Sequence, residues 1–367
     1  MSRIRPCLAL LALLAPALLP GTAHGAGSSS PFVSLSGFTP QKNKVHIINN
    51  LPPPTDQGSL PLCYAHAAAT VYNFYLCKGA GQDCASASRQ DLASPLDITR
   101  FGTPPGKDDD LSYASSYPNI RIEGSSALYT LEKAALFVGE VASQQCAPQE
   151  SFFIGTAATG QGIADDVVLS QGKTLQSLKA FYNKHRPGCD PQCPPEALTE
   201  LADILPNVHT DNLVLSWALR RDSFDGFLTR LAIPRDCMRA KNRAYFDKDN
   251  YSIHVVPSKG KKTLSYERYR STIIDAVKRD NPVILEGICL SAKKKNGECD
   301  DMHSLVVYGY AELCDAEACY TGLKLRSSWG PEWQAAADER WYDARSLFDH
   351  TAQLEGMVGW LTRNPQK

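Results

Sequence analysis

The chain has 367 residues, of which 43% are hydrophobic and 21% are charged, enough apolar material for a core in about two or three units of common domain size. The 25 glycines and 24 prolines are close to the ordinary background, which excludes a collagen-like or low-complexity chain. The 38 Lys and Arg against 39 Asp and Glu give a net charge of -1, which argues against a strongly basic nucleic-acid binder. We therefore expect no nucleic-acid partner.

The first residues have the layout of a secretory signal peptide. Arg3 and Arg5 precede an apolar stretch from 7 to 19, and small residues follow at 23–26. We predict a signal peptide over 1–25 and a leader segment over 26–43. The apolar stretch is shorter than the roughly 20 residues that span a bilayer. We expect a periplasmic or extracellular protein that has no membrane contact after cleavage; the alternative is a retained amino-terminal anchor.

Eleven cysteines remain after removal of Cys7, and an odd number in an exported protein indicates that one stands apart. Short spacings suggest four local disulfides, and two further cysteines then pair by elimination. The predicted pairs are Cys77–Cys84, Cys189–Cys193, Cys289–Cys299, Cys314–Cys319 and Cys146–Cys237. Cys63 is left over. The alternative for one pair is a zinc site at His185, Cys189 and Cys193, which oxidising conditions disfavour, so we expect no metal.

The first half of the chain reads mainly as helices. A short strand at 44–48 ends before the prolines at 52–54. Residues 63–76 are apolar around most of a helix, which predicts a helix buried through the middle of a domain. A loop at 102–119 leads to a helix after Ser125 or Ser126, and three further helical patterns occupy 172–232. We predict a helical lobe over 44–164 and a helical insertion over 165–262.

The last hundred residues read mainly as strands. A helix at 265–279 precedes strand-like segments at 282–290, 304–310, 320–327 and 357–362. We predict a β lobe over 263–367. Helices first and strands last indicate an α+β protein with two lobes.

Three distant side chains have the chemistry of a thiol nucleophile site. Cys63 stands at the amino end of its helix, where unpaired N–H groups and the helix dipole favour the thiolate. His303 begins a strand in the other lobe and could form the ion pair, and Gln57 could supply a side-chain amide for an oxyanion. A cleft between the lobes would bring them together.

These residues resemble the papain-like cysteine peptidases. The motifs are Gln57-Gly58 followed by Cys63-Tyr64, His303-Ser304 opening an apolar strand that ends in Gly309-Tyr310, and Ser327-Ser328-Trp329-Gly330. The resemblance covers about 44–160 and 263–364. It implies a papain-like fold with a helical lobe and an antiparallel β-barrel-like lobe, and no cofactor.

The same resemblance implies a role for each site residue. Cys63 would attack the carbonyl, His303 would protonate the leaving amine, Gln57 would stabilise the oxyanion, and Ser327 with Trp329 would position the imidazole. The implied substrate-binding residues are Tyr64, Glu123, Gly124 and Ser304. Glu286 and Asp301 are weaker candidates for a specificity pocket. The partners would be a peptide or protein substrate and, as a further candidate, a proteinaceous inhibitor.

The chain departs from the family pattern at one functional position. The family has Asn where this chain has Ser327, a shorter group that reaches the imidazole only if the backbone moves closer or a water intervenes. Activity could therefore be reduced. Two alternatives remain: a peptide-binding module that has lost turnover, and a cell-wall peptide amidase or acyl transferase that uses the same Cys63 and His303.

Overall fold

The computed structural model describes residues 31–58, 60–102, 119–122, 124–152, 165–189, 191–206, 208, 210–258, 264–290, 299, 301–352 and 357–365. The predicted signal peptide lies outside these ranges. The helices are α1 Cys63–Ala80, α2 Pro95–Ile98, α3 Ala127–Glu132, α4 Asp165–His185, α5 Pro195–Ile204, α6 Asn212–Leu219, α7 Phe224–Ala232, α8 Tyr266–Val277, α9 Gly330–Asp338 and α10 Ala344–Asp349. The strands are β1 Thr39–Ile47, β2 Glu140–Ala142, β3 Arg243–Tyr245, β4 Tyr251–Val256, β5 Val283–Cys289, β6 Met302–Cys314, β7 Cys319–Arg326, β8 Tyr342–Asp343 and β9 Val358–Arg363.

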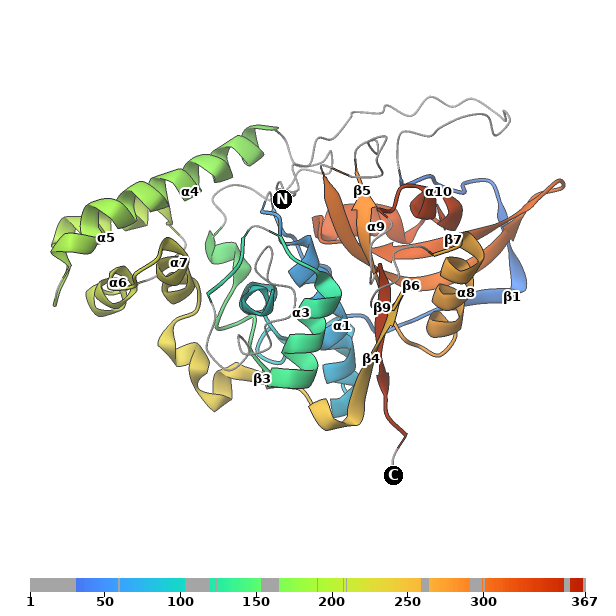
Figure 1. The fold of residues 1–367 in the computed structure, drawn as a ribbon, viewed down its shortest axis with the longest axis horizontal. Coiled ribbons are helices and arrows are strands. Elements are labelled where there is room, and N and C mark those ends of the chain that lie inside the picture. The colour runs from blue at the N-terminus through green and yellow to red at the C-terminus, as the bar shows by residue number, and fades with distance from the viewer. Residues whose placement is uncertain are drawn as a thin grey trace.

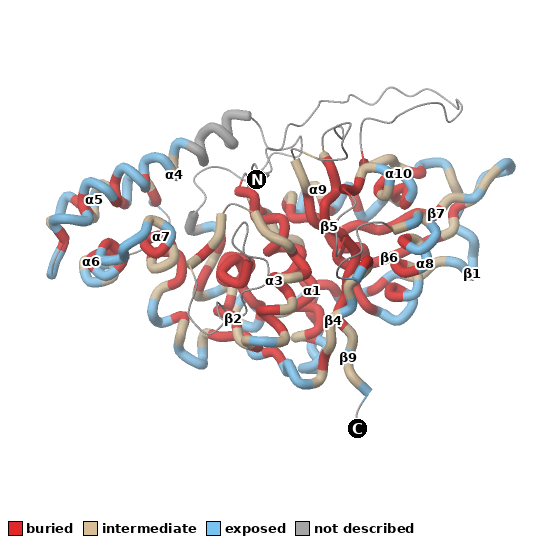
Figure 2. Tube along the Cα trace, in the orientation of Figure 1, coloured by how far each residue is buried: buried red, intermediate tan, exposed pale blue. Residues whose placement is uncertain are grey.

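Helix α1 runs through the centre of the molecule, as its apolar circumference predicts. Every residue from Cys63 to Tyr75 is buried, and Figure 2 shows α1 enclosed by other elements. It ends at Gly81, whose φ of 65° is a left-handed conformation that glycine adopts without steric cost. One large core joins α1 to α3, to α8 and to the sheet. Cys63 is therefore held at the start of a rigid element.

The sheet is antiparallel and has the strand order β4-β9-β5-β6-β7-β8, with β1 pairing β6 in addition. The long β6 pairs with β5 through its first half, where His303 is opposite Ile288, and with β1 through its second half, where Ala311 is opposite Val45. Figure 1 shows the sheet and α8–α10 on one side, the β lobe, with α1 and α3 beside it in the helical lobe. The predicted α+β class, with helices in one lobe and an antiparallel sheet in the other, is confirmed.

The predicted limits of the insertion and of the leader are wrong. The last part of the predicted insertion is β4, which pairs with β9 along its whole length, so residues 251–256 belong to the sheet. Strand β3 pairs with β2 of the helical lobe. Strand β1 begins at Thr39, within the predicted leader. The described helices of the insertion are α4–α7, one more than the three helical patterns.

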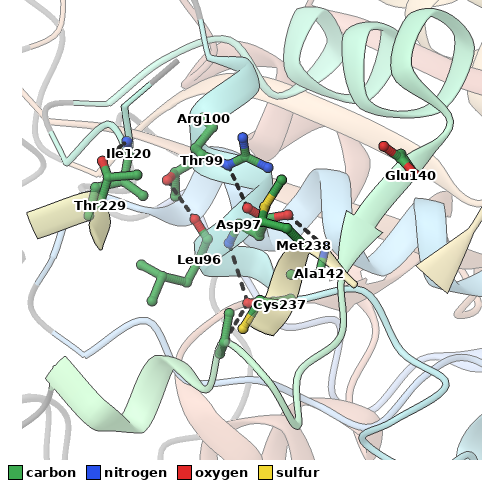
Figure 3. A network of polar contacts seen from close by, with 12 residues as sticks. Leu96, Asp97, Thr99, Arg100, Ile120, Glu140, Ala142, Thr229, Cys237 and Met238 are labelled. Atoms are coloured by element: carbon green, nitrogen blue, oxygen red, sulfur yellow. Dashed lines mark hydrogen bonds and ion pairs between the residues drawn. The ribbon is translucent and has the colours of Figure 1, made fainter. Parts of the chain in front are cut away.

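The insertion has a core of its own that extends into the helical lobe. Apolar residues of α4–α7 form one cluster with Leu96 and Ile120, and Figure 1 shows these helices at the end of the molecule away from the sheet. Thr229 of α7 accepts a hydrogen bond at its Oγ1 from the Ile120 N–H, 2.8 Å away, as Figure 3 shows. Side-chain packing and this bond attach the insertion to the chain segment that precedes Gly124.

A buried ion pair stabilises the neighbouring turn. Asp97 and Arg100 are both buried, with 2.5 Å between Oδ1 and Nε, and the Ala142 N–H donates to Asp97 Oδ2 at 2.6 Å (Figure 3). Burial alone would raise the pKa of Asp97, but the Arg100 guanidinium and the Ala142 N–H hold it below its usual value. Both charges are therefore compensated inside the core.

All five predicted disulfides are present: Cys77–Cys84, Cys146–Cys237, Cys189–Cys193, Cys289–Cys299 and Cys314–Cys319. Disulfides form and persist in oxidising compartments, so this set indicates a secreted environment. In the described part of the chain, no helix combines the length and apolarity that crossing a bilayer requires.

Candidate active site

Cys63 is the first residue of α1 and is the one cysteine outside a disulfide among the described residues. It is 5% exposed. The carbonyl of Leu62 accepts the N–H groups of Ala65 and His66, at 2.9 and 3.1 Å, and so closes the first turn. The thiol thus stands at a helix amino terminus, the position that favours its ionised form.

The loop before Cys63 is hydrogen-bonded to the segment that follows β7. The Gln57 N–H donates to the Ser328 carbonyl at 2.8 Å, and the Gly330 N–H donates to the Thr55 carbonyl at 3.2 Å. Asp56 and Trp329 form the bridge between these two bonds. The loop that leads to α1 is consequently attached to the part of the β lobe that contains Ser327 and Trp329, the residues predicted to position the imidazole.

His303 is held between Ser327 and Trp329. Its Nε2 lies 2.9 Å from the Ser327 hydroxyl, and its ring stacks on the Trp329 indole with 4.4 Å between centroids and 20° between planes. The imidazole is 1% exposed. Ser327 therefore reaches the imidazole directly, without the intervening water that its short side chain suggested, and Nδ1 is the ring nitrogen that Ser327 leaves unused.

The amide of Gln57 is oriented by two partners. Its Nε2 donates to the Leu60 carbonyl at 2.8 Å, and its Oε1 accepts a hydrogen bond from the Ser328 hydroxyl. An amide nitrogen carries two hydrogens, so one remains after the bond to Leu60. Sequence reasoning missed Ser328, although it lies within the Ser327-Ser328-Trp329-Gly330 motif.

Ser327 is in turn positioned by Gln334 of α9, a second residue that sequence reasoning missed. The Ser327 N–H donates to Gln334 Oε1 at 3.2 Å, and Gln334 Nε2 donates to the Leu325 carbonyl at 2.9 Å. Gln334 is 1% exposed. A buried amide that bonds the backbone on both sides of a chain segment fixes that segment.

His66, one turn after Cys63, is a buried core histidine. Its Nδ1 lies 2.6 Å from the Thr55 hydroxyl. Burial lowers the pKa of His66 to about 3; an interaction with Gln149 opposes this shift and the charge of His303 adds to it. The neutral His66 therefore joins α1 to the loop that carries Gln57, within electrostatic reach of His303.

Glu286 of β5 forms a polar contact between the two lobes. The Leu128 N–H donates to its Oε1 at 2.5 Å, and the Ser126 hydroxyl lies 3.1 and 3.2 Å from its two oxygens. Burial raises the pKa of Glu286 to about 7; these donors oppose the shift, and negative charge on Cys63 adds to it. Glu286 therefore lies within electrostatic reach of Cys63 and titrates near neutrality.

The predicted substrate-binding residues have different positions. Gly124 has a φ of +86°, and a Cβ there would be 4.0 Å from the Pro61 carbonyl, so its backbone faces the loop before Cys63. Ser304 is buried beside His303. Glu123 lies outside the described residues.

The Tyr64 side chain is not accessible to a substrate. It is fully buried, and its hydroxyl donates to the Arg121 carbonyl at 2.8 Å. Tyr64 follows Cys63 on α1, and the helix turns its side chain into the core. Its role is to attach the segment before Gly124 to α1.

The zinc alternative is wrong. Cys189 and Cys193 are joined to each other, and His185 Nε2 lies 2.8 Å from Glu200. A further group among the described residues, Glu312 with Cys314 and Cys319, has metal-ligand proximity. Its two cysteines also form a disulfide and offer no thiolate.

Comparison with known proteins gives structural neighbours only. The sequence matches no protein-family model and no curated protein. The proform of the Amb a 11 cysteine protease, a ragweed pollen allergen, is 14% identical with a TM-score of 0.41, over 93% of this chain and 73% of that one. Digestive procathepsin L 3 of Tenebrio molitor is 13% identical with a TM-score of 0.40, over 90% and 73%. Xylellain, a cysteine protease from Xylella fastidiosa, is 13% identical with a TM-score of 0.39, over 94% and 100%.

Proposed function

We propose that this protein is an exported, papain-like cysteine peptidase that hydrolyses peptide bonds with Cys63 and His303. The observation that carries the proposal is the position of the His303 ring, which Ser327 and Trp329 fix. Ser327 and Trp329 belong to the segment after β7, and this segment is hydrogen-bonded to the loop that leads to Cys63. The five disulfides and the predicted signal peptide support export.

Each residue has a chemical role in this proposal. The Cys63 thiolate attacks the carbonyl carbon of the scissile bond, and the remaining N–H of the Gln57 amide stabilises the oxyanion that forms. The protonated His303 gives its proton to the leaving amine, which breaks the C–N bond and leaves a thioester on Cys63. A water molecule then attacks the thioester as His303 takes its proton, and the C–S bond breaks, which releases the acid product and restores the Cys63 thiolate beside the protonated His303.

Ser327 and Trp329 orient the imidazole in this scheme. The Ser327 hydroxyl bonds Nε2 and leaves Nδ1 as the nitrogen that would exchange the proton with the thiol, and the stacked Trp329 limits rotation of the ring and excludes water. Ser328 orients the Gln57 amide from the same segment. The β lobe therefore supplies both the acid and the group that aligns the oxyanion donor.

We expect the substrate to bind beside the segment that ends at Gly124. Its backbone lies opposite the Pro61 carbonyl, and Tyr64 and Thr229 hold the residues that precede it. An extended peptide chain would bind along the partly exposed backbone of Gly124. The substrate class is therefore a peptide or unfolded protein segment.

The test is thiol labelling combined with turnover. We expect a peptidyl epoxide to label Cys63 in the wild-type protein and casein to be cleaved, with both lost in Cys63→Ala and labelling slowed at least tenfold in His303→Ala. Ser328→Ala should lower kcat by about tenfold and leave labelling intact, since it disturbs only the oxyanion donor.

Two other outcomes would overturn the peptidase proposal. Labelling without cleavage of casein, but with release of product from cell-wall peptide fragments, would assign the same Cys63 and His303 to a cell-wall amidase or acyl transferase. Absence of both labelling and cleavage, with retained binding of peptides, would indicate a binding module.

A further inference from the structure

The Trp329 indole is supported by an aromatic cluster from three separate parts of the chain. One face stacks on His303. Phe32 meets the indole edge-on, with 5.5 Å between centroids and 76° between planes, and Trp333 of α9 meets it at 5.1 Å and 86°. Edge-to-face pairs at these separations are favourable and directional. Phe32 therefore limits where the indole can lie.

Phe32 is itself held in place through the backbone around it. The Asp343 N–H donates to the Val33 carbonyl, and the Leu35 N–H donates to the Trp341 carbonyl, each at 2.8 Å. Ser34 forms a bridge with Tyr342. The Phe32 ring also lies 6.0 Å from that of Tyr342, at 79°. The segment 31–35 is thus attached to β8, and it presents one side chain to Trp329.

We propose that Phe32 is a positioning residue that acts through Trp329 on His303. The inference rests on the proposed function, because it assigns the role of Phe32 to the reactive imidazole. The order of contact is Phe32 to Trp329 and Trp329 to His303, with Trp333 as a second support of the indole. Removal of Phe32 takes away one of these two supports and so allows the indole to tilt away from the imidazole.

The position of Phe32 in the chain gives the contact a further consequence. The predicted signal peptide ends at residue 25, so cleavage there leaves Phe32 close to the new amino terminus. Trimming by another protease past Phe32 would remove its contact with Trp329. The amino-terminal segment 31–35 is therefore a structural part of the site and not a spacer.

The experiment compares Phe32→Ala with Phe38→Ala in the mature protein. Phe38 lies near the same segment and meets Tyr320 edge-on at 4.9 Å, away from Trp329, so it controls for loss of an aromatic ring. The first readout is the NMR shift of the His303 ring protons, which the stacked indole displaces. We expect this displacement to be lost in Phe32→Ala and retained in Phe38→Ala.

The second readout is kinetic. We expect kcat to fall by about tenfold in Phe32→Ala with KM changed less than about twofold, because a small misplacement of a reacting group slows the chemical step more than it weakens binding. The alkylation rate of Cys63 should fall in parallel. Phe32→Tyr keeps the edge-on ring and should restore all three values.

The outcomes separate this inference from the proposed function. A lost displacement in Phe32→Ala, with no turnover in the wild-type protein, supports the positioning role and contradicts the peptidase. An unchanged His303 shift together with unchanged kcat overturns the positioning role even if the wild type cleaves casein. If Phe32→Ala does not fold, Phe32→Leu, which retains the apolar bulk, replaces it under the same criteria.

Discussion

The hydroxyl of Ser327 lies 2.9 Å from Nε2 of His303, close enough for a direct hydrogen bond. Ser327 is therefore able to orient the imidazole without an intervening water. We predict that Ser327→Ala lowers kcat by about tenfold to a hundredfold without abolishing it, because the thiol, the imidazole and the oxyanion donor remain. Steady-state kinetics on a fluorogenic peptide measure the effect.

Ser271→Ala is the matched control for Ser327→Ala. Ser271 is an exposed serine of α8, and its substitution should leave kcat unchanged. Equal activity of Ser327→Ala and Ser271→Ala would show that the imidazole needs no orienting hydroxyl.

The second prediction concerns Glu286 and the pH dependence of stability. Its pKa is raised from 4.5 to about 7 in the folded protein, so the unfolded chain loses the proton first and stability falls as pH rises from about 4.5 to about 7. Glu286→Gln does not ionise. We expect this variant to gain about 1–3 kcal/mol relative to the wild type between pH 5 and pH 8.

Urea unfolding of both proteins at a series of pH values measures the difference. Gln at this position still accepts the Leu128 N–H, so the comparison isolates the ionisation. A difference in unfolding free energy that does not change with pH would contradict the raised pKa.

The third prediction concerns His66 and has the opposite sign. Burial lowers the pKa of His66 from 6.5 to about 3, so below pH 6.5 the unfolded chain binds a proton that the folded protein does not. Stability is therefore full above about pH 6.5 and falls as the pH decreases toward 3. We expect His66→Asn to lose this acid-dependent decrease, as measured by thermal unfolding between pH 4 and pH 7.

His254→Asn, at an exposed position of β4, controls for removal of an imidazole as such. NMR provides an independent check, because the His66 ring protons should not titrate between pH 5 and pH 8. A midpoint for His66 within that range would be inconsistent with the neutral buried ring.

The fourth prediction compares two disulfides of different loop length. Cys146–Cys237 closes a separation of 91 residues, and Cys189–Cys193 closes one of 4. Loop entropy grows with the number of residues enclosed, so we expect replacement of the first pair by serines to cost about 2–5 kcal/mol and the second about 2 kcal/mol or less. Denaturant unfolding of the two double variants tests the order, and a reversed order would refute the entropic account.

Sequence reasoning located the elements that depend on local pattern. The apolar helix after Cys63, the strand that His303 opens and the four short-range cysteine pairs are all in the structure, because periodicity and spacing determine them within a few residues. The fifth pair, Cys146–Cys237, followed by elimination. Gln57 was predicted from the chemistry of its amide, and Ser327 and Trp329 came from the motif resemblance. The structure places these residues around His303 and in the loop before Cys63.

The pairing of strands that are distant in the chain could not be predicted from the sequence. Strand β4 follows the insertion, and its partner β9 lies more than a hundred residues later, so nothing local distinguishes it from the helical region before it. Tyr64 adjoins the nucleophile in sequence but faces the core, because a helix turns successive side chains in different directions. Phe32 and Ser328 act through contacts across the fold, which no spacing rule indicates.

The chain leaves the helical lobe after β2 and returns to it at β3, and these two ends are neighbours on a single ladder. Ala142 is opposite Arg243, and the Ser143 N–H donates to the Asn242 carbonyl at 2.9 Å. A tight turn could join the two ends, so the intervening residues form an excursion that can be gained, exchanged or lost without breaking the path of the backbone elsewhere. Exchange of this excursion would have to cover the apolar surface that Leu96 and Ile120 would then expose, and to replace the hydrogen bonds that Ser94 and Asp56 make with Ala147 and Gln149.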